Sequence, residues 1–126
     1  MPRILKAQSD DFNRKAIEQK KCDILYSLEM GNKKDSLKNI DSGLNDILAA
    51  LARKHSVSIG INLEEIKKLG KREKAMRLAK IINNIKICRK ERTKLAIIGD
   101  GKESFFTLLS LGASTEQAKQ ATSKSF

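Results

Sequence analysis

Short apolar segments alternate with helix-like stretches along this chain, and this alternation limits the fold more than any other feature. Four segments rich in branched apolar residues are predicted to be strands, at residues 4–8, 22–26, 57–61 and 95–98. Strands joined through helices must form a parallel sheet with right-handed crossovers. The sequence therefore predicts an α/β fold with about four parallel strands and intervening helices.

The connections between these strands carry helix signals. Helices are predicted at residues 12–19, 71–91, 102–111 and 115–122, the last with capping-box spacing between Ser114 and Gln117. A further helix, capped by Asp41 or Ser42, is predicted to bury the stripe Leu44, Ile47, Leu48 and Leu51. The polar residues 27–41 are expected to form an exposed loop. The 126 residues form one domain, and about four strands are too few for a closed eight-stranded barrel.

Positive charge is concentrated between residues 67 and 94. This segment holds twelve of the 26 Lys and Arg residues and only two acids, Glu73 and Glu91, so it carries +10 of the chain's net +11. Most of these cations lie on the predicted helix 71–91, whose apolar stripe is expected to be Ala75, Leu78, Ala79, Ile82 and Ile85, with Arg77, Lys80 and Asn84 nearly opposite. A basic helix face with so few acids to pair with favours a polyanionic partner.

The basic helix fits a nucleic-acid partner better than it fits plain solvent or a membrane surface. A solvated helix face normally interleaves both signs of charge, and this one does not. A helix lying on an anionic membrane would carry Trp or Phe on its apolar face, and this face is aliphatic. Because the chain has only one Tyr and four Phe, phosphate contacts are expected rather than base stacking. We therefore expect this helix to bind nucleic acid and not a membrane.

Nothing in the sequence assembles a catalytic or metal-binding set of residues. The single histidine, His55, falls at a predicted helix end, and the adjacent acids Asp10-Asp11 and Glu64-Glu65 are expected to be caps or solvated charges. The turn at Gly99-Asp100-Gly101 could cradle a phosphate but favours a plain tight turn. Cys22 and Cys88 are expected to be reduced core thiols, and without a signal peptide the protein is expected to be cytoplasmic.

Several stretches, in order, resemble one protein family. Residues 13–18 followed by 23–25, residues 41–45 leading into 48–52, and residues 59–62 resemble consecutive helices and strands of the TIM-barrel protein subunit of archaeal and eukaryotic ribonuclease P. The most specific similarity covers residues 72–90, with Met76-Arg77, Asn84-Ile85 and Cys88-Arg89-Lys90 placed as in that family's long basic helix. Residues 111–112 and 116–119 resemble its C-terminal helix.

The resemblance implies a partial, open or half, TIM-type β/α barrel and an RNA-binding subunit of ribonuclease P. That ribonucleoprotein removes 5′ leaders from precursor tRNA, and its RNA performs the chemistry. The protein would bind ribonuclease P RNA and other protein subunits, especially a second small protein, and would hold no cofactor, whereas the RNA would need magnesium. Basic positions of the family helix match Arg72, Arg77, Arg89 and Lys90; on charge alone we add Lys67, Lys68, Lys71, Lys74 and Lys80.

This chain departs from the family pattern in two places. The family's N-terminal strands have no counterpart before Ile4, so the barrel is expected to be open, completed by another polypeptide, or completed by a second copy in a homodimer. The family tends to have Ser and Ala where Gly99-Asp100-Gly101 stands. Two alternative functions therefore stay open: a stand-alone interaction module, and a metal-dependent phosphoesterase, which the single histidine disfavours.

Overall fold

Four strands and six helices make up the described part of the chain. The computed structural model describes residues 3–28, 43–98 and 104–123. In order, the elements are β1 (Ile4–Lys6), α1 (Asp10–Glu18), β2 (Ile24–Tyr26), α2 (Asp46–Lys54), β3 (Ser58–Asn62), α3 (Leu63–Lys67), α4 (Lys71–Glu91), β4 (Leu95–Ile98), α5 (Ser104–Ser110) and α6 (Thr115–Thr122). Most of the predicted loop 27–41, the predicted caps Asp41 and Ser42, and the turn at residues 99–101 lie outside the described residues.

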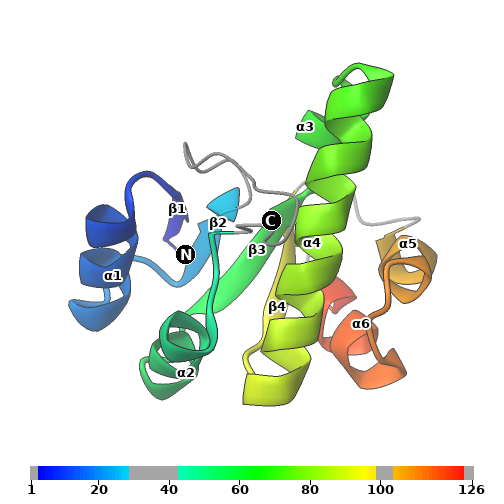
Figure 1. Ribbon diagram of the computed structural model, residues 1–126. Helices are drawn as coiled ribbons and strands as arrows, with labels where there is room; N and C mark the ends of the chain where they lie inside the picture. Colours follow the sequence, from blue (N-terminus) through cyan, green and yellow to red (C-terminus); the bar gives the residue numbers. More distant parts are fainter. Residues whose placement is uncertain (1–2, 29–42, 99–103, 124–126) are drawn as a thin grey trace.

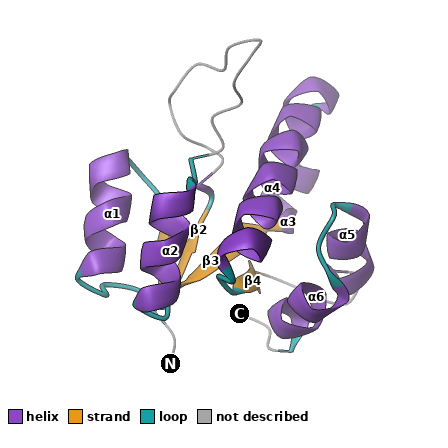
Figure 2. Cartoon of the chain, turned by 60° about the horizontal axis from the view of Figure 1, so that its bottom comes forward, coloured by secondary structure: helices purple, strands orange, loops and turns teal. Residues whose placement is uncertain are grey.

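The strands form one parallel sheet in the order β1-β2-β3-β4. Each strand pairs with the next one in sequence, and Ile24 lies opposite Ser58 just as Ile59 lies opposite Leu95. Helices α1, α2 and α4 line one side of this sheet, and α6 packs beside β4 (Figure 1). The row of helices is also visible from below (Figure 2). This confirms the predicted α/β fold, consistent with part of a TIM-type barrel.

The core lies between the sheet and this row of helices. Alternate residues of each strand face the helices, among them Leu25, Ile59 and Ile97, which are fully or almost fully buried. They belong to the same core cluster as Ile81 and Ile85 of α4. Burying each such side chain contributes about 1.5 to 3 kcal/mol. The small four-stranded sheet therefore obtains its stability mainly from the helix-covered face.

Gly60 allows β2 and β3 to lie close together on the other face of the sheet. A Cβ atom at this position would lie 2.7 Å from Cγ2 of Ile24 and 2.8 Å from Cβ of Tyr26. No side chain fits there without moving its neighbours. The alternation of branched and very small residues in β3 thus reflects crowding by β2.

Two helices end where the sequence predicted. α4 and α6 have the predicted bounds, and the capping box of Ser114 and Gln117 is present. α1 begins at Asp10, before the predicted residue 12, because the Ser9 hydroxyl accepts a bond from the Phe12 amide at 3.2 Å.

The predictions for α2 were wrong in two respects. Its cap is Asn45, whose side-chain oxygen accepts from the Leu48 amide at 2.8 Å, and not Asp41 or Ser42. Its fully buried residues are Ala49 and Ala52, and Ile47 of the predicted stripe is 71% exposed. The rest of that stripe was predicted correctly in part, because Leu44 is buried and Leu48 and Leu51 are half-buried against the core. Small residues are buried here because α2 packs closely beside α4. Just after α4, the Thr93 hydroxyl donates to the carbonyl of Ala49 at 2.7 Å.

Both cysteines belong to the core, as predicted. Cys22 and Cys88 are fully buried and free. Burial raises the pKa of Cys88 to about 12, so this thiol stays protonated and unreactive at neutral pH. Among the helices the structure describes, none is long and apolar enough to cross a membrane.

Candidate nucleic-acid interface

The nine residues predicted to contact RNA divide into three groups in the structure. Six are exposed: Lys67, Lys68, Lys71, Arg72, Arg89 and Lys90. Lys74 is half-buried, and Arg77 and Lys80 are buried, each with 9% exposure. The exposed residues fall at the two ends of the α3–α4 region rather than along one continuous face.

The predicted orientation of α4 was wrong. Its inward positions recur at helical spacing and are Arg77, Lys80, Ile81, Asn84, Ile85 and Cys88. Of the predicted apolar stripe only Ile85 is buried, and Arg77, Lys80 and Asn84, predicted to lie nearly opposite that stripe, are buried instead. Apolar residues occur all around this helix, so its sequence is compatible with more than one buried face. The face that is buried in the structure includes polar residues, such as Arg77, whose partners come from elsewhere in the chain.

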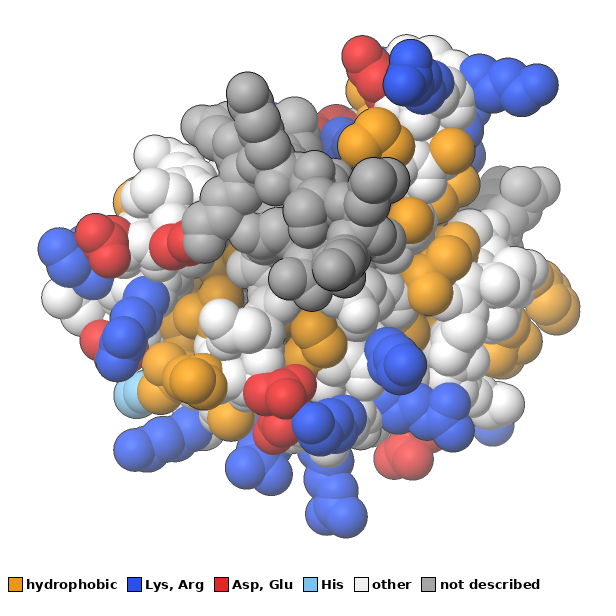
Figure 3. Space-filling model, in the orientation of Figure 1, with side chains coloured by type: hydrophobic (Ala, Val, Ile, Leu, Met, Phe, Trp, Pro, Cys, Tyr) orange, Lys and Arg blue, Asp and Glu red, His pale blue; other side chains and the backbone are white. Residues whose placement is uncertain are grey.

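The outward face of α4 is apolar in its middle and basic at its ends. Met76 and Ile82 are 49% and 45% exposed. From Ala75 to Asn83 the only charged residues are Arg77 and Lys80, both turned inward. At 1.5 Å per residue, Arg72 and Lys86 are about 21 Å apart along the axis. Hydrophobic side chains follow α4 with Lys and Arg at both ends (Figure 3).

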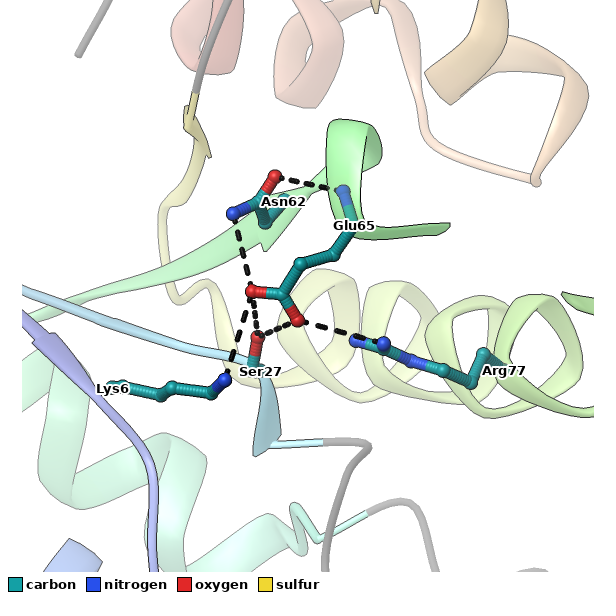
Figure 4. Close-up of polar contacts among 5 residues, drawn as sticks. All are labelled: Lys6, Ser27, Asn62, Glu65 and Arg77. Carbon is teal, nitrogen blue, oxygen red and sulfur yellow. Dashed lines mark hydrogen bonds and ion pairs between the residues drawn. The ribbon is translucent and has the colours of Figure 1, made fainter. Parts of the chain in front are cut away.

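A polar network at the carboxyl ends of the strands explains why Arg77 is buried. The Glu65 carboxylate lies 3.5 Å from Nη1 of Arg77 and 3.8 Å from Nζ of Lys6. It also accepts from the Ser27 hydroxyl at 3.3 Å and from the Asn62 amide at 3.3 Å (Figure 4). Glu65 therefore links β1, β2 and β3 to α4, and is not the solvated charge predicted from its position beside Glu64.

Helix α3 positions this carboxylate, and sequence reasoning missed that helix. The Asn62 side-chain oxygen accepts from the Glu65 amide at 3.2 Å and so caps the first turn. Asn followed three residues later by Glu is a helix-start signature that could have revealed it. Ser27 has the left-handed φ of 61°, which turns the chain at the end of β2.

A second group of cations lies at the opposite edge of the sheet. The connections that enter β2, β3 and β4 meet there because parallel strands share their amino ends. We call the exposed cations of these connections the amino-edge patch: Lys20, Lys21, Arg53, Lys54, Arg92 and Lys94. The nearby acids are Asp23, whose pKa is lowered by the Arg3 amide, and Glu91. Sequence reasoning missed the patch because its members are scattered over 75 positions and meet only through the sheet topology.

The C-terminal end of α4 leads into the amino-edge patch. Lys90 lies 3.0 Å from Oδ2 of Asp46 at the start of α2, and this hydrogen bond raises the pKa of Lys90. Both side chains are more than half exposed, so the pair contributes little to stability. Arg89 is exposed on the same turn.

The candidate catalytic residues that the structure describes lie at helix ends. His55 is the C-cap residue of α2, as predicted from its position, where a helix end favours a cation. Within residues 3–28, 43–98 and 104–123, no three His, Cys, Asp or Glu side chains lie close enough together to hold a metal ion.

Comparison with known proteins identifies the relatives of this chain. No family model matches it. It is 32% identical over 94 residues to ribonuclease P protein component 3 of Methanocaldococcus jannaschii, a match that covers 75% of this chain and 38% of that protein. One chain of the cryo-EM structure of archaeal ribonuclease P with mature tRNA superposes with a TM-score of 0.78 at 26% identity, covering 95% of this chain and 52% of that one.

The chain therefore spans about half, or less, of the length of the relatives it matches. The similarity in structure extends across the four strands and the helices between them, because it covers nearly the whole chain. Sequence and fold agree with the ribonuclease P resemblance that the sequence motifs carry. The chain is a homologue of ribonuclease P protein component 3.

Proposed function

We propose that this chain is an RNA-binding protein subunit of ribonuclease P, which supports the catalytic RNA in removing 5′ leaders from precursor tRNA. The observation that carries the proposal is the superposition of 95% of the chain on a chain of archaeal ribonuclease P, together with 32% identity to protein component 3. The excess positive charge of +11 is the second support, because such a charge favours a polyanionic partner.

In this proposal the exposed cations at both ends of α4 contact RNA phosphates. Lys67, Lys68, Lys71 and Arg72 form the first group, and Arg89 and Lys90 the second. Half-buried Lys74 joins the first group. Arg77 and Lys80 act from within the fold, since both are buried and Arg77 faces Glu65.

We propose that the partners are ribonuclease P RNA and other protein subunits, with a second small protein as the main protein contact. Met76 and Ile82 support a protein contact, because large exposed apolar side chains between the cations do not contribute to binding RNA phosphates. A homodimer that completes the barrel is the competing arrangement.

The protein would contribute binding and not bond cleavage. The RNA would perform the phosphodiester hydrolysis, with magnesium serving the RNA and no cofactor held by the protein. Neutralising RNA phosphates with Lys and Arg lowers the repulsion between packed RNA helices, so the protein should reduce the magnesium concentration that the RNA needs.

Reconstitution tests the proposal. The protein is added with the other subunits to the ribonuclease P RNA of the same organism, and 5′-leader removal is assayed at several magnesium concentrations. A lowered magnesium requirement supports the proposal, and an Arg72→Glu variant should lose much of the effect. Tight RNA binding without any stimulation would favour a stand-alone interaction module, and metal-stimulated cleavage by the protein alone would favour a phosphoesterase.

A further inference from the structure

A cavity of about 200 Å³ opens at the amino edge of the sheet. It lies between the end of α2, the start of β3 and the segment that enters β4. Its polar lining consists of Arg53, Ser56, Ser58, Arg92 and Lys94, and Ala52 and Val57 complete the wall. Three cations and two hydroxyls converge there without an acidic side chain in the lining, which is the composition of an anion site.

Backbone hydrogen bonds hold the walls of this amino-edge pocket in place. The Ser58 amide donates to the carbonyl of Asp23 at 2.8 Å, and the Ile59 amide donates to the carbonyl of Lys94 at 2.9 Å. On the α2 side, the Val57 amide donates to the carbonyl of Ala52 at 2.8 Å. The cations therefore project from a framework that is already ordered, so an anion does not have to organise the site.

Stabilising the ends of helices explains only some of the cations in this pocket. Cations stabilise the C-terminal ends of helices, and Arg53, in the last turn of α2, satisfies that requirement. Lys94 precedes β4 and lies at no helix end. Arg92 adopts the left-handed φ of 60°, a conformation that glycine adopts more readily than arginine. Arg92 is the C-cap residue of α4, whose last turn already carries Arg89 and Lys90, so Lys94 is the cation of the pocket that no helix end explains.

Phosphate is the anion that suits this pocket best. Guanidinium groups pair with two phosphate oxygens at once, and serine hydroxyls can donate to a third. The cavity is open to solvent at the edge of the fold and is lined by Arg92, the C-cap residue of α4, whose last turn carries the exposed cations Arg89 and Lys90. A chain of phosphates crossing the end of α4 would continue directly onto the amino-edge patch.

We propose that the amino-edge pocket binds a backbone phosphate of RNA, and this rests on the proposed RNA-binding function. The pocket adds a contact on the opposite edge of the sheet from the Glu65 network. It would place the bound RNA across the C-terminal end of α4 and the amino ends of the strands. The residues that make the contact are Arg53, Arg92 and Lys94, with Ser56 and Ser58 as donors.

The test compares RNA binding by the whole protein and by matched variants at several salt concentrations. The pocket variant combines Arg53→Gln, Arg92→Gly and Lys94→Gln, where glycine at position 92 keeps the left-handed backbone. Lys15→Gln on α1, also exposed, is the control for loss of charge elsewhere. Lys71→Gln with Arg72→Gln reports on the other end of α4. Thermal melting of each variant checks that it is folded.

The pocket variant should bind ribonuclease P RNA about tenfold or more weakly. The plot of log affinity against log salt concentration has a negative slope, and the pocket variant should make it shallower by about 0.7 to 0.9 for one lost phosphate contact. Lys15→Gln should change neither the affinity nor this slope. If the pocket variant binds RNA as tightly as the wild-type protein and the Lys71→Gln, Arg72→Gln variant binds more weakly, the pocket is not an RNA contact but the proposed function stands. Absence of RNA binding by the wild-type protein would overturn both.

The NMR chemical shifts of the Ser56 and Ser58 amides distinguish the source of the phosphate. A short RNA should change these shifts in the wild-type protein and not in the pocket variant. If inorganic phosphate changes them and RNA does not, the pocket takes a free phosphate and its assignment to RNA is wrong.

Discussion

The guanidinium of Arg77 lies 3.5 Å from the carboxylate of Glu65, twelve residues earlier in the chain, on the face of α4 that turns toward the sheet. Both side chains are largely shielded, with 11% exposure for Arg77 and 27% for Glu65. Because the same carboxylate also contacts Lys6 and Ser27, the pair links the basic helix to the carboxyl ends of β1 and β2.

Arg77→Ala is expected to destabilise the protein. It removes the main partner of a half-buried carboxylate and leaves a void beside the sheet, at a cost of about 2 to 4 kcal/mol in the free energy of unfolding. Arg72→Ala, an exposed arginine on the same helix, should change that free energy by less than about 0.5 kcal/mol. Urea denaturation of the two variants measures both values.

A double-mutant cycle then separates the ion pair from the packing. Glu65→Gln keeps the shape of the side chain and removes its charge, so its effect and that of Arg77→Ala should be less than additive by about 0.5 kcal/mol or more. Fully additive effects would mean that the two side chains are held independently and that their contact does not orient α4.

Ile81 and Ile82 offer a direct test of the helix face, because they are adjacent and identical in chemistry. Ile81 is fully buried and Ile82 is 45% exposed. Ile81→Ala should cost about 2 to 5 kcal/mol of stability, and Ile82→Ala should cost less than about 1 kcal/mol. Equal losses measured by thermal or urea unfolding would contradict an α4 that turns Ile81 toward the sheet.

These residues also show how far sequence reasoning can reach. The four strands and the bounds of α4 and α6 follow from local information, namely apolar runs, helical periodicity and the capping box of Ser114 and Gln117. The face of α4 does not, because burial of Arg77 depends on Glu65, and Glu65 is positioned by a helix that sequence reasoning missed. A polar residue on an inward stripe is recognised only when its partner is known.

The binding surface was only partly predictable for the same reason. The cations of residues 67–94 are contiguous in sequence, so their excess charge is visible without a structure. Lys20, Arg53 and Lys94 are far apart in sequence and come to one edge only because all the strands are parallel. For α2, the choice between Ile47 and Ala49 as the buried residue depends on how closely α4 approaches, which is a property of packing.

Gly60→Ala should weaken the sheet. The added methyl group would meet Ile24 at 2.7 Å and the Tyr26 Cβ at 2.8 Å, so β2 and β3 must move apart, at a cost of about 1 to 3 kcal/mol. Gly70→Ala is the matched control, because nothing lies within 4 Å of a Cβ atom there. Its cost should stay below about 1 kcal/mol, the effect of a weaker N-cap on α4. Equal melting temperatures for the two variants would show that the strands tolerate the methyl group.

Asp23 is expected to make stability depend on acid pH. Its Oδ2 accepts a hydrogen bond from the Arg3 amide at 2.8 Å, and this bond, with the charges of Arg3 and Lys20, lowers the pKa of Asp23 below its ordinary value of 3.8. The bond tethers the residue before β1 to the start of β2. A carboxyl with a lowered folded-state pKa stabilises the folded state above pH 3.8 and loses that contribution as the pH falls through its folded-state pKa.

Asp23→Asn should therefore be less stable than the wild-type protein at pH 7. The two should converge as the pH drops below 3.8, because a protonated Asp and an Asn both lack the charge. Urea denaturation of both proteins from pH 7 down to the acid range measures the difference as a function of pH. A stability gap that stays constant across this range would mean that the Asp23 charge does not hold the Arg3 amide, and that the two strands are joined at this edge by their backbone bonds alone.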